Sequence, residues 1–431
     1  MSGPHALTNL TVGSVTRPAS PHTPEVGGDI CVVGAGIAGV SAALEAAKLG
    51  HRVVLVDALP VLGGQCANSL IGLFCGVYGN APRFAQLTHG IFDAMFADLS
   101  RTGDIRFVES HTRNASYDEV AVGRWIENQV LAAGITVLTG ASVRRVERDG
   151  DRIAAVTAST RHGDVRVRAE AFVDASGDAS LTWEAGFECR VPERTIWGSQ
   201  QVRIEGIRRE SAPTQDELVT TLRRLGDEYG LSRKEGLVFY FPGRDTAVLN
   251  MTHVAAPLEP EEAARAQLTG RVQADRVVDF LRAEFPDAFG DARVRLYGFP
   301  GRRQTRWISS LHELTVDEVR SGTLFDDAVA RTAWPIELHD RIEGYVWEKF
   351  DGDHVHYVPL RSLLPKESAN LVAAGRCVDG DAGALSSVRV MGPCAAMGHA
   401  AAHVLDLVGG GRPADVDAAR LRSRIAENIV G

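Results

Sequence analysis

The chain has 431 residues, of which 45% are hydrophobic and 23% are charged, and its formal net charge is −9 at pH 7. This composition is typical of a folded globular protein and excludes a fibrous or disordered one, while the length favours two lobes or one domain with a large insertion. The acidic balance disfavours nucleic acid and anionic membranes as partners. No apolar run is long enough to span a bilayer and no secretory signal pattern opens the chain, so we expect a cytoplasmic protein with a small-molecule partner.

Residues 1–28 are rich in Pro, Ser, Thr and Gly and have no sustained apolar period, which predicts a mobile tail. The six cysteines contain no CxxC pair, so neither a disulfide framework nor a metal site is expected. Cys31 lies in an apolar run, where it is expected to be a small buried hydrophobic residue.

Residues 29–57 have the pattern of a βαβ dinucleotide-binding unit. The apolar run DICVV is followed by the glycine turn GAGIAG, an Ala- and Leu-rich stretch with helical spacing, and the β-branched run HRVVLVD. Gly34 would make the tight turn, Gly36 would let the backbone approach a pyrophosphate, and Gly39 would let helix and strand pack closely. Asp57 closes the second strand, where a ribose hydroxyl is held.

The helix of this unit would point its N-terminus at the phosphate charge, which makes Ile37 and Ala38 cofactor candidates. Ala58, directly after the acidic residue, is a further candidate. NAD would satisfy this unit as well as FAD does. The unit alone therefore predicts a dinucleotide and leaves the choice to the rest of the chain.

Residues 118–133 suit a helix, and residues 134–168 then alternate like strands and turns, with Val143 among them as a cofactor candidate. This pattern predicts a β-meander inserted into the nucleotide-binding fold. AFVDASGD at 171–178 and NLVAAG at 370–375 are expected to be strands that return to the first sheet. The turns after them supply four cofactor candidates: Ala175, Gly177, Asp178 and Gly375.

From residue 190 to residue 353 the pattern changes to mixed strands and amphipathic helices, which predicts an inserted substrate-capping lobe. The expected fold is therefore α/β. Residues 29–189 and 354–431 would form a Rossmann-like nucleotide-binding domain with an inserted β-meander, and residues 190–353 a mixed α+β lobe.

Taken together, the chain after the tail resembles the FAD-dependent oxidoreductases with a glutathione-reductase-like FAD fold, which are related to fumarate-reductase-type flavoproteins. The resemblance is carried by GAGIAG, LGGQ at 62–65, GRRQTRWISS at 301–310, TLFDDAVARTAWPIELHD at 323–340 and the block at 356–405. It implies an FAD enzyme in which the last block completes the flavin site. Gly64 and Gln65 match positions where many flavoproteins bring the backbone near the ribityl and pyrophosphate atoms; a plain turn is the alternative.

The C-terminal block supplies the remaining cofactor candidates. Residues 386–391 would begin a helix whose free N–H groups favour negative charge on the reduced flavin, so Val390 and Met391 are expected beside it. Arg376 and Arg389 would add positive charge near the pyrophosphate or the flavin O2 edge, although a surface ion pair is the ordinary role of a single arginine.

Flavin chemistry also needs a base close to the reacting bond, and histidine suits that role near neutral pH. His354 and His356 alternate on an expected strand, which would point both toward the flavin; two exposed strand residues are the alternative. His356 is the preferred base. His339, in WPIELHD, ranks behind it and is equally expected to be a structural hydrogen-bonding residue.

Arg302, Arg303 and Arg306 crowd within one short segment, which suits recognition of a carboxylate or another anion. A solvated turn is the alternative. Cys75 lies in IGLFCGVYGN, where the resemblance suggests proximity to the flavin. A redox thiol, a covalent flavin anchor and a packed small residue are all open for it.

The leading expectation is a dehydrogenase or oxidase that moves two electrons from a small organic substrate to FAD, with a second copy or an electron-acceptor protein as further partner. An NAD(P)H-using flavin monooxygenase or halogenase is the first alternative, because VDASGD also resembles segments of those enzymes, although the WxWxIP element of flavin halogenases is missing. The second alternative is a non-catalytic protein that keeps FAD for structure and binds a protein partner.

Overall fold

The computed structural model describes residues 12–16, 18, 22–241 and 245–430. Its centre is a parallel sheet in the order β22-β11-β2-β3-β7. The strands are β2 Ile30–Val33, β3 Val53–Asp57, β7 Thr136–Thr139, β11 Ala171–Asp174 and β22 Leu371–Ala373. Every residue of β2, β3, β11 and β22 is buried, as expected where strands read as uninterrupted apolar runs. The predicted Rossmann-like α/β fold is confirmed.

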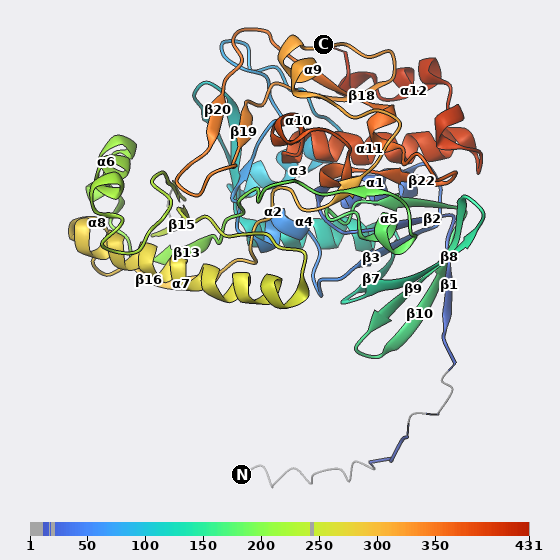
Figure 1. Cartoon of the computed structure of the whole chain (residues 1–431), viewed down its shortest axis with the longest axis horizontal. Helices are drawn as coiled ribbons and strands as arrows, with labels where there is room; N and C mark the ends of the chain where they lie inside the picture. Colours follow the sequence, from blue (N-terminus) through green and yellow to red (C-terminus); the bar gives the residue numbers. More distant parts are fainter. Residues whose placement is uncertain (1–11, 17, 19–21, 242–244, 431) are drawn as a thin grey trace, which may run out of the picture.

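Two helices from opposite ends of the chain pack along each other beside this sheet. They are α1, Ile37–Lys48, and α11, Met391–Val408 (Figure 1). Gly398 permits the close approach, because a Cβ at this position would overlap the carbonyl group of Ala38. The C-terminal segment is therefore fixed against the first turn of the nucleotide-binding unit.

The predicted β-meander is present at the lower right of Figure 1, formed by β8 Ser142–Asp149, β9 Arg152–Thr160 and β10 Gly163–Arg168. A short strand, β1 Glu25–Gly27, pairs with β10 in parallel. The prediction of a mobile tail at 1–28 is therefore wrong for Glu25–Gly27. The strand was missed because three residues are too few to show the alternation of a strand in the sequence. Of the rest of that tail, residues 1–11, 17 and 19–21 lie outside the described residues.

The capping lobe has a hydrophobic core of its own, which extends from Val202 to Tyr297. Its sheet has the order β14-β15-β13-β16, at the left of Figure 1. The elements are β13 Val202–Glu205, α6 Gln215–Leu225, β14 Leu237–Tyr240, β15 Thr246–Asn250, α7 Pro260–Glu284, α8 Pro286–Phe289 and β16 Arg293–Tyr297. Trp307 and Ile336 pack instead into the main core. The residues that share this separate core therefore span a shorter range than the lobe expected at residues 190–353.

The remaining strands form small sheets around the main core. They are β4 Leu73–Phe74, β5 Ile105–Glu109, β6 Arg113–Tyr117, β12 Cys189–Arg190, β17 Trp307–Ile308, β18 Ala328–Thr332, β19 Ile336–Leu338, β20 Val346–Glu348 and β21 His356–Pro359. β18 pairs with β21 and β19 with β20, both antiparallel. These pairs bring residues 328–359 back over the C-terminal helices.

The other helices complete the layers on either side. They are α2 Gly64–Asn68, α3 Ile91–Thr102, α4 Glu119–Ala132, α5 Ser180–Glu184, α9 Val316–Ser321, α10 Ala382–Val388 and α12 Ala418–Arg424. Short 3-10 turns lie at Arg209–Ser211, Leu360–Leu363, Gly375–Cys377, Pro413–Asp415 and Ala426–Asn428. Within the described ranges, none of the helices combines the length and apolarity needed to cross a membrane.

Candidate functional site

The predicted cofactor residues gather at the carboxyl edge of the parallel sheet. Because β2, β3, β11 and β22 run parallel, the turns that follow them meet at one edge. Those turns contain most of the candidates: Gly34, Gly36, Ala58, Ala175, Gly177, Asp178, Gly375 and Arg376. In open α/β sheets this edge is where dinucleotides bind.

The glycine turn between β2 and α1 has the shape of a phosphate cradle. A Cβ at residue 39 would overlap the carbonyl oxygen of Gly34, whereas a Cβ at residue 36 would meet no atom within 4 Å. Gly39 is thus needed for packing, while Gly36 faces open space. α1 begins without a side-chain cap and without an acidic residue in its first turn, which leaves its N–H groups to a phosphate. An FAD pyrophosphate fits these residues, with Ile37 and Ala38 in the first turn.

Asp57 lies at the end of β3 and faces this turn. Its carboxylate accepts hydrogen bonds from the N–H groups of Ala35 at 2.5 Å and Leu59 at 2.7 Å. Burial raises the pKa of Asp57 above its ordinary value, although these two hydrogen bonds act in the opposite direction. Asp57 therefore holds the glycine turn in place, and its contact with a ribose stays a prediction. Ala58 beside it is exposed, and the side chain of Val143 packs into the core below the meander.

Asp178 joins several candidates from distant segments. Its carboxylate accepts hydrogen bonds from Arg376 at 3.3 Å and from the Thr305 hydroxyl at 2.5 Å, and it forms an ion pair with Arg302 at 3.7 Å. Gln65 also donates a hydrogen bond to the carbonyl oxygen of Arg302 at 3.1 Å. Arg302 thus lies among cofactor candidates, which does not support its expected role at the substrate. Arg376 Nη1 is buried without a partner among the described residues, so it has a donor left for an anion.

The N-terminus of α11 closes the other side of this edge. Val390 is its N-cap and provides no side-chain hydrogen bond, which leaves the N–H of Met391 for a ligand, since residue 393 is a proline without an N–H. Ser386 was expected in this turn but lies in α10, so the helix begins five residues later than expected. The N–H of Gly392 donates to the carbonyl oxygen of Cys75 at 2.9 Å. Cys75 is therefore fixed next to the expected flavin position.

The thiol of Cys75 is in a setting that disfavours reactivity. Burial, together with the negative charge of Glu337, raises the pKa of Cys75 well above its ordinary value. The thiolate is the nucleophilic form, so a thiol in this setting stays protonated and weakly reactive. Its side chain is only partly buried. We therefore interpret Cys75 as a lining residue, the packed small residue of the three predicted roles.

The two histidines preferred as bases form a closed network elsewhere. β21 begins at His356, so His354 lies outside the strand that was expected to hold both. Ser387 donates to the carbonyl oxygen of Trp334 at 2.6 Å, so its hydroxyl oxygen accepts from His356 Nε2 at 2.7 Å. His356 Nδ1 lies 3.2 Å from His354 Nε2, and His354 is also hydrogen-bonded to the backbone of Val319.

Both ring nitrogens of His356 are consequently occupied, and its side chain is fully buried. Burial lowers the pKa of His356 to about 3, so the ring is neutral. A base must present a free nitrogen to the substrate, and this ring presents none. The geometry therefore argues against His356 as the base, and His354 is one of its two hydrogen-bonding neighbours.

A second group of polar side chains lies beside Cys75 and has the properties of an acid and base site. Glu337, on β19, accepts a hydrogen bond from His339 Nε2 at 2.8 Å. The Glu337 side chain keeps 20% of its surface exposed, whereas the His339 side chain has none. His339 Nδ1 lies 2.9 Å from His253 Nε2, and His253 Nδ1 lies 2.8 Å from the carbonyl oxygen of Ile342. These contacts form a chain from a partly exposed carboxylate into the interior.

The chain has a place for one proton more than its two imidazoles carry. A carboxylate and a carbonyl only accept, so His339 Nε2 and His253 Nδ1 must each hold a proton. The contact between His339 Nδ1 and His253 Nε2 is a hydrogen bond only if a third proton lies in it. Two neutral imidazoles supply two protons. The contact between the two rings therefore lacks a proton, and Glu337 cannot supply it, because His339 Nε2 already holds one.

The charges around this chain favour an ionised carboxylate and neutral rings. Burial acts to raise the pKa of Glu337, but the hydrogen bond from His339 and the charges of Arg389 and Arg303 outweigh it and hold that pKa well below its ordinary value. Burial, followed by the charge of Arg303, lowers the pKa of His339 to about 3. Burial, followed by Arg233, lowers the pKa of His253 to about 2. The resting chain is thus a carboxylate with two neutral imidazoles.

Three guanidinium groups, those of Arg303, Arg389 and Arg233, lie within electrostatic range of the Glu337 carboxylate, and Arg233 also lies within range of Glu235. Burial lowers the pKa of all three, to about 9 for Arg303. Their hydrogen bonds go to neutral oxygens, namely those of Trp197, Ser199, Asn250 and Thr252 and the backbone carbonyl of Glu337. Buried charges need partners, so the excess of positive charge favours a bound anion.

Sequence reasoning named some members of this cluster but not its centre. Arg303 was named as an anion-binding candidate, Arg389 was expected to add positive charge near the pyrophosphate or the flavin O2 edge, and His339 was ranked behind His356. Glu337 was missed, although its spacing of two residues from His339 could have indicated a pair on one side of a strand. His253 and Arg233 come from the capping lobe, and nothing local in the sequence connects them to Glu337.

The fold and this edge define a flavoprotein whose chain returns at its C-terminus to complete a dinucleotide site. The family model described as FAD dependent oxidoreductase matches residues 29–425. The chain belongs to this family, which makes it an enzyme with FAD as its cofactor. The predicted resemblance is confirmed.

Other similarities are weaker. A Methanosarcina barkeri protein, described as an uncharacterized protein in the nifH2 5' region, is 27% identical over 177 residues, which are 37% of this chain and 87% of that protein. A geranylgeranyl bacteriochlorophyll reductase-like protein of Thermoplasma acidophilum has a TM-score of 0.49 at 14% identity, covering 94% of this chain and 84% of its own. A myxobacterial chondrochloren halogenase has a TM-score of 0.47 at 14% identity, covering 93% and 78%.

Proposed function

We propose that this chain is an FAD-dependent dehydrogenase or oxidase that removes two electrons from a small organic anion, with Glu337 as the base. The observation that carries this proposal is the ionised, partly exposed Glu337 carboxylate, which accepts a hydrogen bond from His339 and lies within range of the charges of Arg303 and Arg389. It lies beside Cys75, whose backbone is bonded to the first turn of α11. The cluster and the expected flavin position are thus adjacent.

The residues divide the chemistry between them. Bound FAD supplies a two-electron acceptor that takes one hydrogen of the substrate as a hydride. Glu337 takes the second hydrogen as a proton from the substrate oxygen or nitrogen, and the substrate is left with a new C=O or C=N double bond. The proton stays on Glu337, because the nitrogen that faces it, His339 Nε2, already holds a proton. Arg303 and Arg389 hold the anionic group of the substrate, and an anion there also reduces the positive field that opposes proton uptake.

The test is anaerobic mixing of the FAD-loaded protein with 2-hydroxy and 2-amino carboxylates and with their methyl esters, following loss of flavin absorbance. Carboxylates should reduce the flavin at least about 30-fold more efficiently than their esters, because an unpaired buried charge costs about 2 kcal/mol or more. Equal rates for acids and esters would contradict the anionic substrate. Fast reduction by NADPH, followed by oxygen insertion into a substrate, would favour a monooxygenase instead.

Neighbouring arginines provide a matched pair of variants. Arg303→Met should remove most of the preference for carboxylates over esters while FAD stays bound, because Arg303 lies near Glu337. Arg302→Met should lower FAD affinity instead, because Arg302 pairs with Asp178 among the cofactor candidates. If both variants lose the preference for carboxylates over esters equally, the assignment of Arg303 to the substrate and of Arg302 to FAD is wrong.

A further inference from the structure

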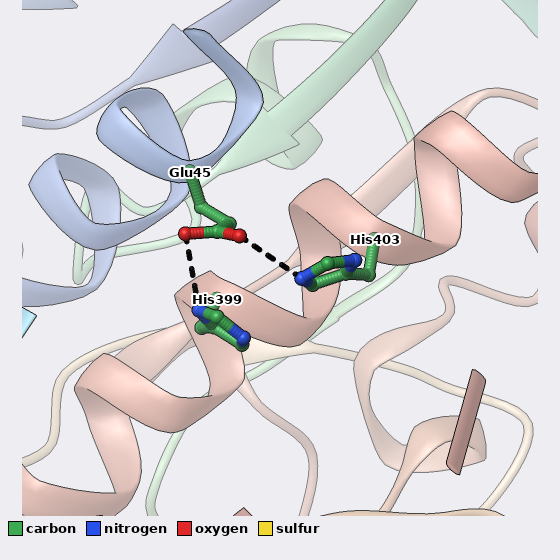
Figure 2. Close-up of side chains that lie close together, drawn as sticks. All are labelled: Glu45, His399 and His403. Carbon is green, nitrogen blue, oxygen red and sulfur yellow. Dashed lines mark ion pairs between the residues drawn. The ribbon is translucent and has the colours of Figure 1, made fainter. Parts of the chain in front are cut away.

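A cluster of one carboxylate and two imidazoles lies between α1 and α11, away from the site described above. Glu45 extends from α1, and His399 and His403 extend from α11 (Figure 2). The histidines are four residues apart on one helix, so both rings lie on the same face. Glu45 is about 12 Å along α1 from the first turn that faces the phosphates. Figure 2 shows the Glu45 carboxylate between the two rings, with one oxygen toward each.

The distances between the ligand atoms match those around a small metal ion. Glu45 Oε1 lies 3.1 Å from His403 Nε2, and Glu45 Oε2 lies 3.6 Å from His399 Nδ1. All three groups offer ligand atoms within 4.8 Å of one another. A tetrahedral zinc ion with bonds of about 2.0–2.2 Å separates its ligand atoms by about 3.3–3.6 Å. The separation to His399 lies at the upper end of this range, and the separation to His403 is slightly shorter than its lower end.

Direct hydrogen bonding does not explain the whole cluster. The separation of 3.6 Å between His399 Nδ1 and Glu45 is too long for a hydrogen bond. The His399 ring therefore faces a carboxylate that it does not bind. Gly90 lets the backbone pass close to this ring, since a Cβ at residue 90 would lie 3.2 Å from His399 Nδ1, a tight contact. A metal ion bound to both groups would account for the separation between His399 Nδ1 and Glu45.

The protonation states also suit metal ligands. Burial acts to raise the pKa of Glu45, but the hydrogen bond from His403 and the charge of His399 outweigh it and lower that pKa to about 2. Burial lowers the pKa of His399 to about 4. At neutral pH the carboxylate is ionised and the His399 ring is neutral, as metal binding requires.

The cluster is also accessible to an ion. The side chains of Glu45, His399 and His403 keep 11%, 12% and 8% of their surface exposed. Lys48 Nζ lies 3.4 Å from Glu45 Oε2, and a metal ion would compete with this charge. The Lys48 side chain is 75% exposed, so it can turn into solvent when an ion enters.

We propose that Glu45, His399 and His403 bind one divalent transition-metal ion, for which Zn²⁺ is the best match, with water as the remaining ligand. Two imidazoles and a carboxylate form a donor set that suits zinc. The ion would link α1 to α11, the two helices whose N-termini frame the expected FAD site. His403 Nδ1 is buried without a partner among the described residues, so a ligand role leaves its N–H unpaired. We therefore expect a dissociation constant on the order of 1 μM rather than the tighter values of fully supported zinc sites.

The test is isothermal titration of the chelator-treated, FAD-loaded protein with Zn²⁺. The wild type should bind one ion per chain. Glu45→Gln and His403→Ala should each weaken this binding by at least about 100-fold, since changes outside the ligand shell alone cost 10–100-fold. His51→Ala is the matched control, because it removes another histidine–carboxylate pair, with Asp406 of the same helix at 2.9 Å, and should leave zinc binding unchanged.

Thermal unfolding provides a second measurement that does not depend on one variant. Zn²⁺ should raise the melting temperature of the wild type and of His51→Ala, but not that of Glu45→Gln, which keeps the size of the side chain. FAD content shows whether each variant is folded, and His399→Asn replaces His403→Ala if the latter is not. The proposal is overturned if the wild type shows no saturable zinc binding, or if Glu45→Gln and the histidine variant bind as the wild type does.

Discussion

Glu337 Oε1 accepts a hydrogen bond from His339 Nε2 at 2.8 Å, and through this contact a carboxylate with partly exposed surface is connected to a fully buried imidazole. The relationship orients the Glu337 carboxylate and keeps part of its surface accessible. In contrast, both ring nitrogens of His356 have partners in a buried network with Ser387 and His354.

Glu337→Gln should slow flavin reduction by the best carboxylate donor by about 10²–10⁴-fold, because an amide cannot take the substrate proton. FAD binding should not change, since Glu337 lies outside the glycine turn and the Asp178 group. Anaerobic stopped-flow absorbance of the variant measures the rate, and the bound FAD content is the control. His356→Asn should keep a rate close to that of the wild type. A slow His356→Asn variant beside an unimpaired Glu337→Gln variant would reverse the assignment.

Gly39→Ala should lower both FAD occupancy and stability, because its Cβ would overlap the carbonyl oxygen of Gly34. Overpacking of this kind costs about 1–3 kcal/mol of unfolding free energy. Gly123→Ala is the matched control in α4, where the new Cβ would lie 3.5 Å from the Cβ of Ala67, an ordinary contact. That control should be neutral or more stable by up to about 1 kcal/mol. Urea unfolding and flavin fluorescence after denaturation measure the two effects, and equal behaviour of both variants would contradict the packing argument.

Stability should fall as the pH decreases below about 6.5, partly because of His356. Burial lowers the pKa of His356 from 6.5 to about 3, so between these values the unfolded chain binds a proton that the folded chain does not. The contribution of this residue is therefore fully present above pH 6.5 and is lost as the pH falls, at up to about 1.4 kcal/mol per pH unit. Urea titrations of the wild type and His356→Asn at saturating FAD should give parallel pH profiles above pH 7. Below pH 6 the wild type should show the steeper decline, and identical slopes there would refute the assignment.

The sequence by itself determined the dinucleotide-binding unit, because strand, glycine turn, helix, second strand and terminal acid follow one another within residues 29–57. Each depends on local properties: apolar runs, helical spacing, and the steric need for glycine at residues 34 and 39. The return of the segments ending at Asp178 and Gly375 to the same sheet was also predictable, since buried parallel strands have short apolar patterns of their own. Where the pattern was only three residues long, as at Glu25–Gly27, the strand was missed.

Only the tertiary structure decided which titratable groups face the cofactor edge. Alternation along β21 could not tell whether His356 faces a cavity or Ser387, because the orientation of a strand depends on what packs against it. His339 and His253 are 86 residues apart and meet only because the capping lobe folds over β19. Glu45 and His403 likewise meet only because Gly398 lets α11 approach α1. The dinucleotide-binding unit therefore follows from contiguous sequence, whereas the base, the anion-binding arginines and the proposed metal site depend on long-range packing, which has no local pattern.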